Sequence, residues 1–305
     1  MKLALKIDVD TLRGTLLGVP QLMDILERFG VRATFLFSFG PDHTGRALRR
    51  ALRPGFLSKV RRTSVLSHYG LRTCLYGTLL PGPDIGRRGA SIMREVERRG
   101  HEVGIHAFDH VLWQDQVAHR DERWTLAQMT AAAERFVEIF GRPSQVHAAA
   151  GWQMNSSAFF AEEQFGFSYA SDTRGLEPFY PRIGGATVRC PQFPTTLPTL
   201  DELIGRSDMN SETPVAHLLR LTAARRHDHV YTLHAELEGG QLSRWFETLL
   251  EGWQEQGFEL STLGQLVAST NVRDIAEREV TYGPMPGRSG FLALASPTEH
   301  TAYAS

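Results

Sequence analysis

The stretch Leu3-Ala4-Leu5-Lys6-Ile7-Asp8-Val9-Asp10 decides the fold, because an apolar run ends there in two aspartates. Two later apolar runs end in a similar way: residues 102–105 precede His106, and residues 230–233 precede His234. Short apolar runs of this kind are typical of buried parallel strands. In α/β folds, residues at the carboxyl ends of parallel strands converge at one mouth. We therefore expect these polar side chains to share a pocket.

Segments with strand-like and helix-like patterns alternate along most of the chain. The predicted strands are 3–9, 33–39, 102–105, 167–170, 230–233 and 258–260, and the predicted helices are 19–29, 90–99, 126–140, 156–165, 215–226 and 242–256. Such alternation indicates parallel strands covered by helices. Periodicity alone leaves a barrel and an open sheet as alternatives.

The residues at the predicted strand ends have the composition of a metal-hydrolase centre. One carboxylate and two imidazoles can hold a borderline divalent ion and leave positions open for water and substrate. We assign Asp10, His106 and His110 as metal ligands, Asp8 as proton acceptor and His234 as proton donor. Because Asp8 and Asp10 point the same way from an extended segment, their roles could be exchanged. The ligand set does not distinguish Zn, Co, Mn and Fe.

Each motif taken alone also has an ordinary structural explanation. An Asp-x-Asp pair is common at strand-end turns and helix caps. Two histidines four residues apart are neighbours on a helix face, but the twelve histidines of this chain make an accidental pair easy. A single histidine such as His234 is most often a core or surface residue. The combination after three predicted strands is what favours catalysis.

The composition agrees with one catalytic domain. The chain has 305 residues, 42% of them hydrophobic and 22% charged, which is enough for one large core. Its two cysteines indicate no disulfide framework and favour a reducing compartment. We expect no secretory signal and no membrane span. A single domain is predicted over residues 1–292, followed by a disordered tail at 293–305.

A basic segment interrupts the alternation of strands and helices. Eight lysines and arginines, and no acidic residue, occur between Arg46 and Arg72. Apolar residues fall on approximately one side, although Pro54-Gly55 would interrupt a helix. We expect an insertion at about 45–85 that binds an anionic membrane surface. The residues assigned to this contact are Arg49, Arg50, Lys59, Arg61 and Arg62. A solvated basic helix and a nucleic-acid patch are the alternatives.

The order of these motifs resembles the polysaccharide deacetylase family, also called the NodB-homology family, whose members remove N- or O-acyl groups from sugars. The family's first motif contains a base aspartate and a metal aspartate, its second is His-x-x-x-His, and its last contains the acid histidine. The resemblance implies a distorted, incomplete (β/α) barrel of about seven parallel strands. We adopt this fold as our prediction.

A narrower resemblance implies a substrate. The segments that carry it are 6–11, 104–110, 148–152, 171–175, 194–199 and 232–236. They resemble the deformylases of this family that act on 4-deoxy-4-formamido-L-arabinose carried on undecaprenyl phosphate. The expected partners are thus a polyprenyl-phosphate-linked amino sugar and an anionic membrane, with no nucleic acid. The resemblance also implies a peripheral protein on the cytoplasmic face of a bacterial inner membrane, and a role in lipid A modification and polymyxin resistance.

Two departures from the general family pattern concern the proton acceptor. Val9 separates aspartates that are usually adjacent, and residues 148–152 lack the arginine that usually orients the base. Arg174 is our candidate for that orienting role. Backbone N–H groups near Gly151 and Trp152 are expected to hold the oxyanion.

Further expectations concern substrate contacts and the competing functions. Glu236 is a candidate support or substrate contact. An N-deacetylase of another glycan and a non-catalytic protein of the membrane surface remain as alternatives. A pure binding protein has no use for an acid at His234, which argues against the second alternative.

Overall fold

A parallel sheet of seven strands forms the centre of the computed structural model, which describes residues 1–51, 72–204, 212–288 and 290–296. The strand order is β5-β4-β3-β2-β1-β8, and β9 pairs with the first residues of β1. The strands are β1 (Lys2–Val9), β2 (Thr34–Ser38), β3 (Glu102–Ala107), β4 (Val146–His147), β5 (Tyr169–Ala170), β8 (His229–His234) and β9 (Glu259–Ser261). All of these pairings are parallel, which confirms the predicted fold class.

An irregular segment joins the two ends of the sheet. The backbone N–H of Phe193 donates to the carbonyl of Ala170, at the end of β5, over 2.7 Å. Three residues further on, the N–H of Thr196 donates to the carbonyl of Val230 in β8 over 3.1 Å. Residues 192–196 therefore close the sheet into a distorted barrel without forming a regular strand of their own.

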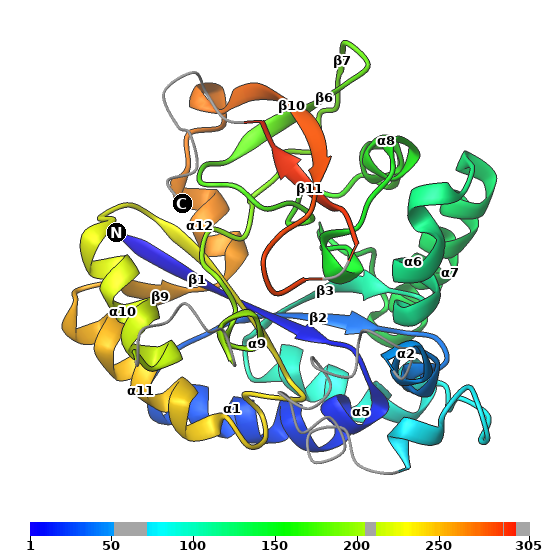
Figure 1. Cartoon of the computed structure of the whole chain (residues 1–305), viewed down its shortest axis with the longest axis horizontal. Helices are drawn as coiled ribbons and strands as arrows, with labels where there is room; N and C mark the ends of the chain where they lie inside the picture. The colour runs from blue at the N-terminus through cyan, green and yellow to red at the C-terminus, as the bar shows by residue number, and fades with distance from the viewer. Residues whose placement is uncertain (52–71, 205–211, 289, 297–305) are drawn as a thin grey trace.

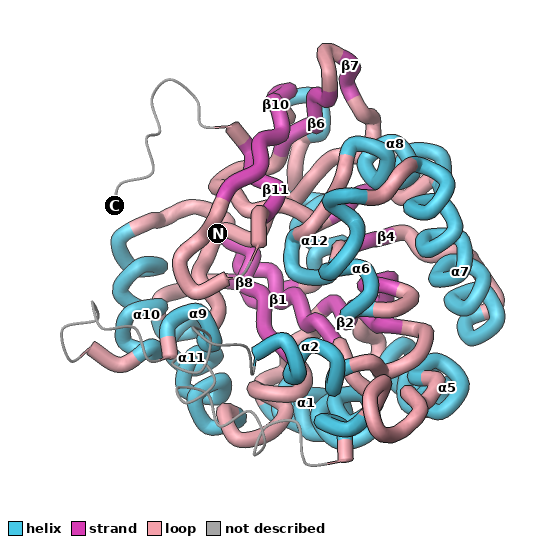
Figure 2. The backbone as a smooth tube through the Cα atoms, turned by 45° about the vertical axis from the view of Figure 1, so that its right-hand side comes forward, coloured by secondary structure: helices cyan, strands magenta, loops and turns pink. Residues whose placement is uncertain are grey.

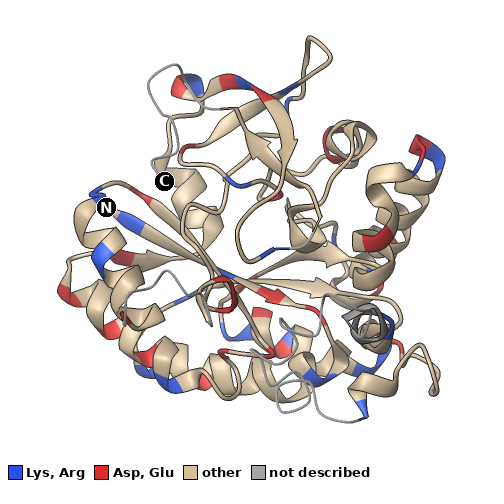
Figure 3. Ribbon diagram, viewed as in Figure 1, with Lys and Arg blue, Asp and Glu red and all other residues tan. Residues whose placement is uncertain are grey.

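Helices form the outer layer around the sheet (Figures 1 and 2). They are α1 (Val19–Arg28), α5 (Ile85–Arg98), α7 (Glu122–Phe140), α8 (Ser156–Phe165), α10 (Pro214–Ala224), α11 (Ser243–Glu255) and α12 (Leu263–Ser269). Two of them begin earlier than predicted because the side chains of Asp84 and Asp121 cap α5 and α7 by accepting backbone N–H groups. The outer helices carry charges of both signs (Figure 3).

A second, smaller sheet lies beside the barrel, at the top of Figure 1. Its strands are β6 (Phe179–Ile183), β7 (Ala186–Thr187), β10 (Ala276–Gly283) and β11 (Leu292–Ala295), in the order β11-β10-β6-β7. The prediction that residues 293–305 form a disordered tail is therefore wrong for residues 293–295, which belong to β11. Ala293 is fully buried, because its side chain packs into the main hydrophobic core while the backbone of β11 pairs with that of β10. Residues 297–305 lie outside the described part of the chain.

Short helices complete the described structure. They are η1 (Gly14–Gly18), α2 (Thr44–Ala51), η2 (Thr73–Leu75), α6 (His110–Gln116), η3 (Val117–His119), η4 (Ala150–Trp152), α9 (Leu200–Leu203) and η5 (Val272–Asp274). Among the helices described, none is both long and apolar enough to cross a bilayer.

The two ends of the predicted basic insertion lie together. The N–H of Gly45 donates to the carbonyl of Tyr76 over 3.0 Å, and the Arg46 guanidinium donates to the carbonyl of Gly77 over 2.9 Å. Residues 52–71, which include Lys59, Arg61 and Arg62, lie outside the described residues, as do the side chains of Arg49 and Arg50. The membrane contact assigned to these five residues therefore stays a prediction.

Candidate active site

Three predicted metal ligands meet at the carboxyl end of the sheet. Asp10 directly follows β1, His106 lies in β3, and His110 is the first residue of α6. Oδ1 of Asp10 lies 3.2 Å from Nε2 of His106 and 3.4 Å from Nε2 of His110. One potential ligand atom from each residue lies within 4.8 Å of the other two. The sequence prediction that these three side chains converge is thus matched by the geometry.

The spacing of His106 and His110 indicated neighbours on one helix face, but the structure does not place them on the same helix. His106 is a strand residue and His110 begins α6, which Asp109 caps by accepting the Leu112 N–H over 3.0 Å. The turn between strand and helix brings the two rings to a centroid separation of 5.3 Å. The interpretation as helix neighbours was therefore wrong, although the pair still converges.

A backbone carbonyl fixes the orientation of His106. Its Nδ1 donates to the carbonyl oxygen of Ala148 over 2.6 Å. This hydrogen bond leaves the Nε2 lone pair free and directed toward Asp10, as is usual for a metal-binding histidine.

The loop that carries Ala148 rests on a second group of buried ionisable residues. His147 contacts Glu162 at 2.8 Å and Asp172 at 2.9 Å, and the amide of Gln192 donates to both carboxylates. Burial raises the pKa of Glu162 well above its ordinary value, which favours its neutral form beside Asp172. Although these atoms are close enough to hold a metal ion, they satisfy one another. We interpret the group as a support for the loop.

Asp10 has the properties of a ligand carboxylate. Its Oδ1 is buried and has no hydrogen-bond partner among the described residues. Burial alone would raise the pKa of Asp10, but the neighbouring His110 and His106 outweigh it and lower the pKa. An ionised carboxylate with an unsatisfied oxygen beside two imidazoles fits a divalent metal ion.

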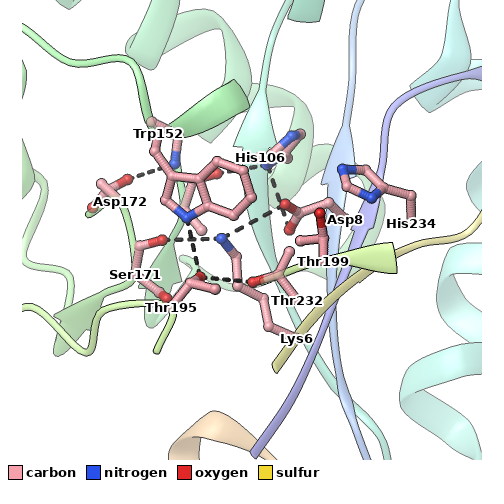
Figure 4. A network of polar contacts seen from close by, with 12 residues as sticks. Lys6, Asp8, His106, Trp152, Ser171, Asp172, Thr195, Thr199, Thr232 and His234 are labelled. Atoms are coloured by element: carbon pink, nitrogen blue, oxygen red, sulfur yellow. Dashed lines mark hydrogen bonds and ion pairs between the residues drawn. The ribbon is translucent and has the colours of Figure 1, made fainter. Parts of the chain in front are cut away.

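Asp8 and His234 lie opposite each other on neighbouring strands. Their Cα atoms are partners in the register of β1 and β8, and both side chains are buried. Oδ1 of Asp8 lies 3.8 Å from Nδ1 of His106, while its Oδ2 lies 3.6 Å from Nζ of Lys6 (Figure 4). Lys6 belongs to the first motif but was assigned no role from the sequence. Its spacing of two residues from Asp8 is the signal that could have shown their common face.

An aspartate that the sequence analysis missed lies beside His234. Oδ1 of Asp201, in α9, lies 3.8 Å from Nδ1 of His234. Burial alone would lower the pKa of His234, but the carboxylates of Asp201 and Asp10 outweigh it and raise the pKa. The raised pKa favours the imidazolium, which is the form a proton donor needs. The Thr199–Glu202 capping box that begins α9 was the local signal for this short helix.

Glu236 supports the turn that carries Asp10. Its Oε1 accepts the N–H of Asp10 at 3.1 Å, and both the N–H and the hydroxyl of Thr11 at 2.9 and 2.8 Å. Burial, and then the charge of Asp10, raise the pKa of Glu236 to about 8. A side chain on Gly14 would overlap Glu236, because its Cβ would lie 2.0 Å from Oε1. The contacts of Glu236 are those of a supporting residue.

The third expected motif forms a tight turn. Gly151 and Trp152 both have left-handed φ values, +64° and +55°. A Cβ on Gly151 would also lie 2.4 Å from Gln114. The N–H of Trp152 donates to the carbonyl of Ala149 over 3.2 Å, so it is engaged within the turn. This contact disagrees with the expectation that the Trp152 N–H holds an oxyanion.

Arg174 packs against the ring of Trp152 and makes its hydrogen bonds to Glu202 and Leu197. Its guanidinium donates to Glu202 over 2.6 Å and to the carbonyl of Leu197 over 3.0 Å, and its Cζ lies 4.8 Å from the ring centroid of Trp152. These contacts hold α9 and do not reach Asp8. The expectation that Arg174 orients Asp8 therefore finds no support in its hydrogen bonds.

Comparison with known proteins identifies the class that this fold and site define. The model of the polysaccharide deacetylase family matches residues 13–170, and the chain belongs to that family. Among solved structures, a polysaccharide deacetylase from Mycobacterium smegmatis superposes with a TM-score of 0.62 at 18% identity, covering 93% of this chain and 94% of that one. A family 4 acetyl xylan esterase from Clostridium thermocellum, in complex with a cobalt ion, gives 0.50 at 12% identity, covering 88% and 91%.

Two curated relatives are more specific. A protein of Shewanella sediminis described as the 4-deoxy-4-formamido-L-arabinose-phosphoundecaprenol deformylase ArnD is 37% identical over 96% of this chain and 94% of its own length. A protein of Wigglesworthia glossinidia brevipalpis with the same description is 31% identical, over 92% and 97%. The predicted resemblance to these deformylases is confirmed along nearly the whole chain.

Proposed function

We propose that this protein is a metal-dependent deformylase that releases formate from 4-deoxy-4-formamido-L-arabinose linked to undecaprenyl phosphate. The observation that carries the proposal is the joint position of two sets of residues. A carboxylate and two imidazoles converge at Asp10, while Asp8 and His234 lie in register on adjacent strands. The two curated relatives described as deformylases support the choice of substrate.

Asp10, His106 and His110 would hold the divalent ion. A bound ion would polarise the formyl carbonyl and lower the pKa of a water molecule beside it. The solved esterase with a cobalt ion supports a divalent metal in this fold. The ligand set itself suits Zn, Co, Mn and Fe equally.

The remaining side chains would move the protons. Asp8 accepts a proton from the attacking water, whose oxygen bonds to the formyl carbon. His234 donates its proton to the sugar nitrogen as the C–N bond breaks, so that the amine leaves in a neutral form. The raised pKa of His234 beside Asp201 supports this direction of transfer. The products are formate and a free amino sugar.

The chemical consequence of the reaction is a change of charge. A formamide is neutral, whereas the free amine is protonated near neutral pH. An amino sugar of this kind, transferred to lipid A, would mask phosphate charges and weaken the binding of cationic peptides such as polymyxin. This role is the biological part of the proposal.

Contact with a membrane surface is the second part of the proposal. Leu79, at the end of the basic insertion, is 81% exposed, and Leu17, in η1 after β1, is 56% exposed. A cleft of about 490 Å³ at the foot of the insertion is lined by three arginines, Arg72, Arg87 and Arg88, by one acid, Asp84, and by apolar residues. Exposed leucines and an excess of arginines suit the surface of an anionic bilayer. We infer a peripheral protein on the cytoplasmic face of a bacterial inner membrane, with no nucleic-acid partner.

The main competing function is an N-deacetylase acting on another glycan, since the same residues would hydrolyse an acetamide. A purified sample should be given the formylated and the acetylated amino sugar on the same polyprenyl phosphate, and amine release should be followed. We expect faster release from the formylated substrate. Faster release from the acetylated one would replace the proposal by a deacetylase, and no release from either would favour a non-catalytic membrane protein.

A further inference from the structure

Lys6 is a fully buried lysine inside the barrel. Its ammonium donates to the carbonyl oxygen of Ser171 over 3.0 Å and lies 3.6 Å from Oδ2 of Asp8 (Figure 4). It also lies 5.1 Å from the ring centroid of Trp152. Burial of an ammonium group is costly unless a carboxylate compensates it, so a lysine at this position needs an explanation.

Two carboxylates, those of Asp8 and Asp172, act on the charge of the buried Lys6 ammonium. Burial, the largest influence, lowers the pKa of Lys6, and Arg174 acts in the same direction, while Asp8 and Asp172 oppose them. Of these two carboxylates, Asp172 already accepts hydrogen bonds from the Ala149 N–H and the Gln192 amide. The ammonium of Lys6 lies 3.6 Å from Oδ2 of Asp8, and the other oxygen of Asp8, Oδ1, is buried with no hydrogen-bond partner among the described residues. Lys6 is therefore the cation available to Asp8.

Arg174, which is buried, and Arg288, which is partly exposed, make their hydrogen bonds to residues other than Asp8. Arg174 donates to Glu202 and to a backbone carbonyl. Arg288 donates to Glu202 over 2.7 Å and to Thr199 over 2.8 Å, and it also contacts Asp201 at 3.2 Å. Their hydrogen bonds hold α9 in place, so neither side chain is directed at Asp8 as Lys6 is.

We propose that Lys6 is the positioning residue for Asp8 in the hydrolytic reaction. The inference rests on the proposed function, in which Asp8 accepts the proton of the attacking water. Lys6 and Asp8 are two residues apart on β1, so their side chains leave the strand on the same side. The Ser171 carbonyl and the Trp152 ring hold the ammonium on one side of the carboxylate. The attraction holds Oδ2, which leaves Oδ1 turned toward His106 and the reacting water.

Kinetics of Lys6→Met, which removes the charge but keeps a similar length, test this role. We expect kcat to fall by about 10²-fold, the usual effect of misplacing a reacting group, with KM changed by less than about 3-fold. Lys2→Met is the matched control, because Lys2 lies on the same strand but pairs with the exposed Glu259. Lys6→Arg keeps the charge and should recover part of the loss. A wild-type kcat in Lys6→Met, or no recovery in Lys6→Arg, would overturn the proposal.

A thermodynamic cycle tests the same contact without any activity assay. Thermal unfolding and bound metal are measured for Lys6→Met, Asp8→Asn and the double variant. We expect unchanged metal content in Lys6→Met, and a higher Tm for the double variant than for Asp8→Asn alone, because the latter leaves a buried cation unpaired. The proposal would be overturned if the decreases in Tm of the two single variants added up in the double variant. It would also be overturned if Lys6→Met failed to fold both alone and together with Asp8→Asn. If the wild-type protein released no formate, the proposed function would be refuted, but the Tm values would still measure the interaction between Lys6 and Asp8.

Discussion

Asp8 and His234 are direct partners across the parallel strands β1 and β8. The pairing fixes the distance between the proposed proton acceptor and donor through the backbone of the sheet. Neighbouring strands lie about 4.8 Å apart, and paired residues project their side chains to the same face. A substrate acyl group could therefore meet both side chains at one mouth of the barrel, beside the three metal-binding side chains.

The first prediction concerns the metal ligands. Asp10→Ala, His106→Ala and His110→Ala should each lose most of the bound metal, because each change removes one of three protein ligands. Metal analysis of the purified variants checks this result. Glu162→Gln is the control, since it alters the second group of buried ionisable residues and should keep the metal. Full metal content in all three alanine variants would refute the ligand assignment.

The second prediction concerns the proton donor. His234→Ala should keep the metal and lower the turnover of the formamide by roughly two to four orders of magnitude. The loss should be much smaller on an activated ester, whose leaving group needs no proton. Asp201→Asn should show the same pattern more weakly, because Asp201 acts through His234. An equal loss on both substrates would remove His234 from the role of acid.

The third prediction concerns the pH dependence of stability. Nδ1 of His101 accepts the N–H of Ala33 over 3.3 Å, and burial lowers the pKa of His101 from 6.5 to about 4. Between these values the unfolded chain binds a proton that the folded protein does not. The free energy of unfolding should therefore fall as the pH falls through this window, with a slope of up to about 1.4 kcal/mol per pH unit.

Urea unfolding at pH 7 and pH 5 measures this slope. His101→Asn is the matched variant, since it offers an oxygen to the Ala33 N–H but does not titrate in this range. The variant should lose stability less steeply than the wild type between the two pH values. Identical slopes would show that His101 is not the residue responsible.

The fourth prediction concerns the basic insertion. Changing Arg49, Arg50, Lys59, Arg61 and Arg62 together to Gln should release the protein from anionic vesicles, since each basic side chain near the surface contributes about 1 kcal/mol. Added salt should weaken binding of the wild type in the same direction. Turnover of a short, water-soluble analogue should survive. A parallel loss on that analogue would make the insertion part of the active-site wall.

A charge-matched control distinguishes specific docking from a change in net charge. It replaces five arginines outside the insertion by Gln: Arg182, Arg225, Arg226, Arg244 and Arg273. This control should still sediment with anionic vesicles. Unchanged vesicle binding by the insertion variant would contradict the membrane assignment.

Much of the barrel could be predicted because its strands are continuous apolar runs. Residues 3–9 were predicted as a strand, and β1 spans Lys2–Val9. The two-residue strand β4 was missed because Val146 lies among polar residues, whereas the equally short β5 was predicted within the mainly apolar run 167–170. The strand β11 was missed because its alternation of Leu and Ala is too short to distinguish from a flexible tail. Local pattern therefore identified strands that lie in apolar runs, whereas β4 and β11 depend on tertiary pairing.

The candidate site could be predicted where the chemistry follows a strand end. His106 and His234 have this signal, as does Asp10. Asp201 lacked a sequence signal of comparable strength, because it approaches His234 from a four-residue helix that follows an irregular segment. Lys6 had a signal of spacing, but its burial against Asp8 depends on the closure of the barrel by distant residues such as Ser171.

Formate release with and without Asp8 tests the central claim most directly. The wild-type protein with one divalent ion is mixed with the formamido sugar on polyprenyl phosphate, and formate and free amine are both quantified. We predict one formate for each amine, and a turnover lower by roughly two to four orders of magnitude in Asp8→Asn with the metal retained. Loss of metal in Asp8→Asn would mean that Asp8 and Asp10 have exchanged roles. Absence of formate from the wild-type reaction would contradict the proposed function.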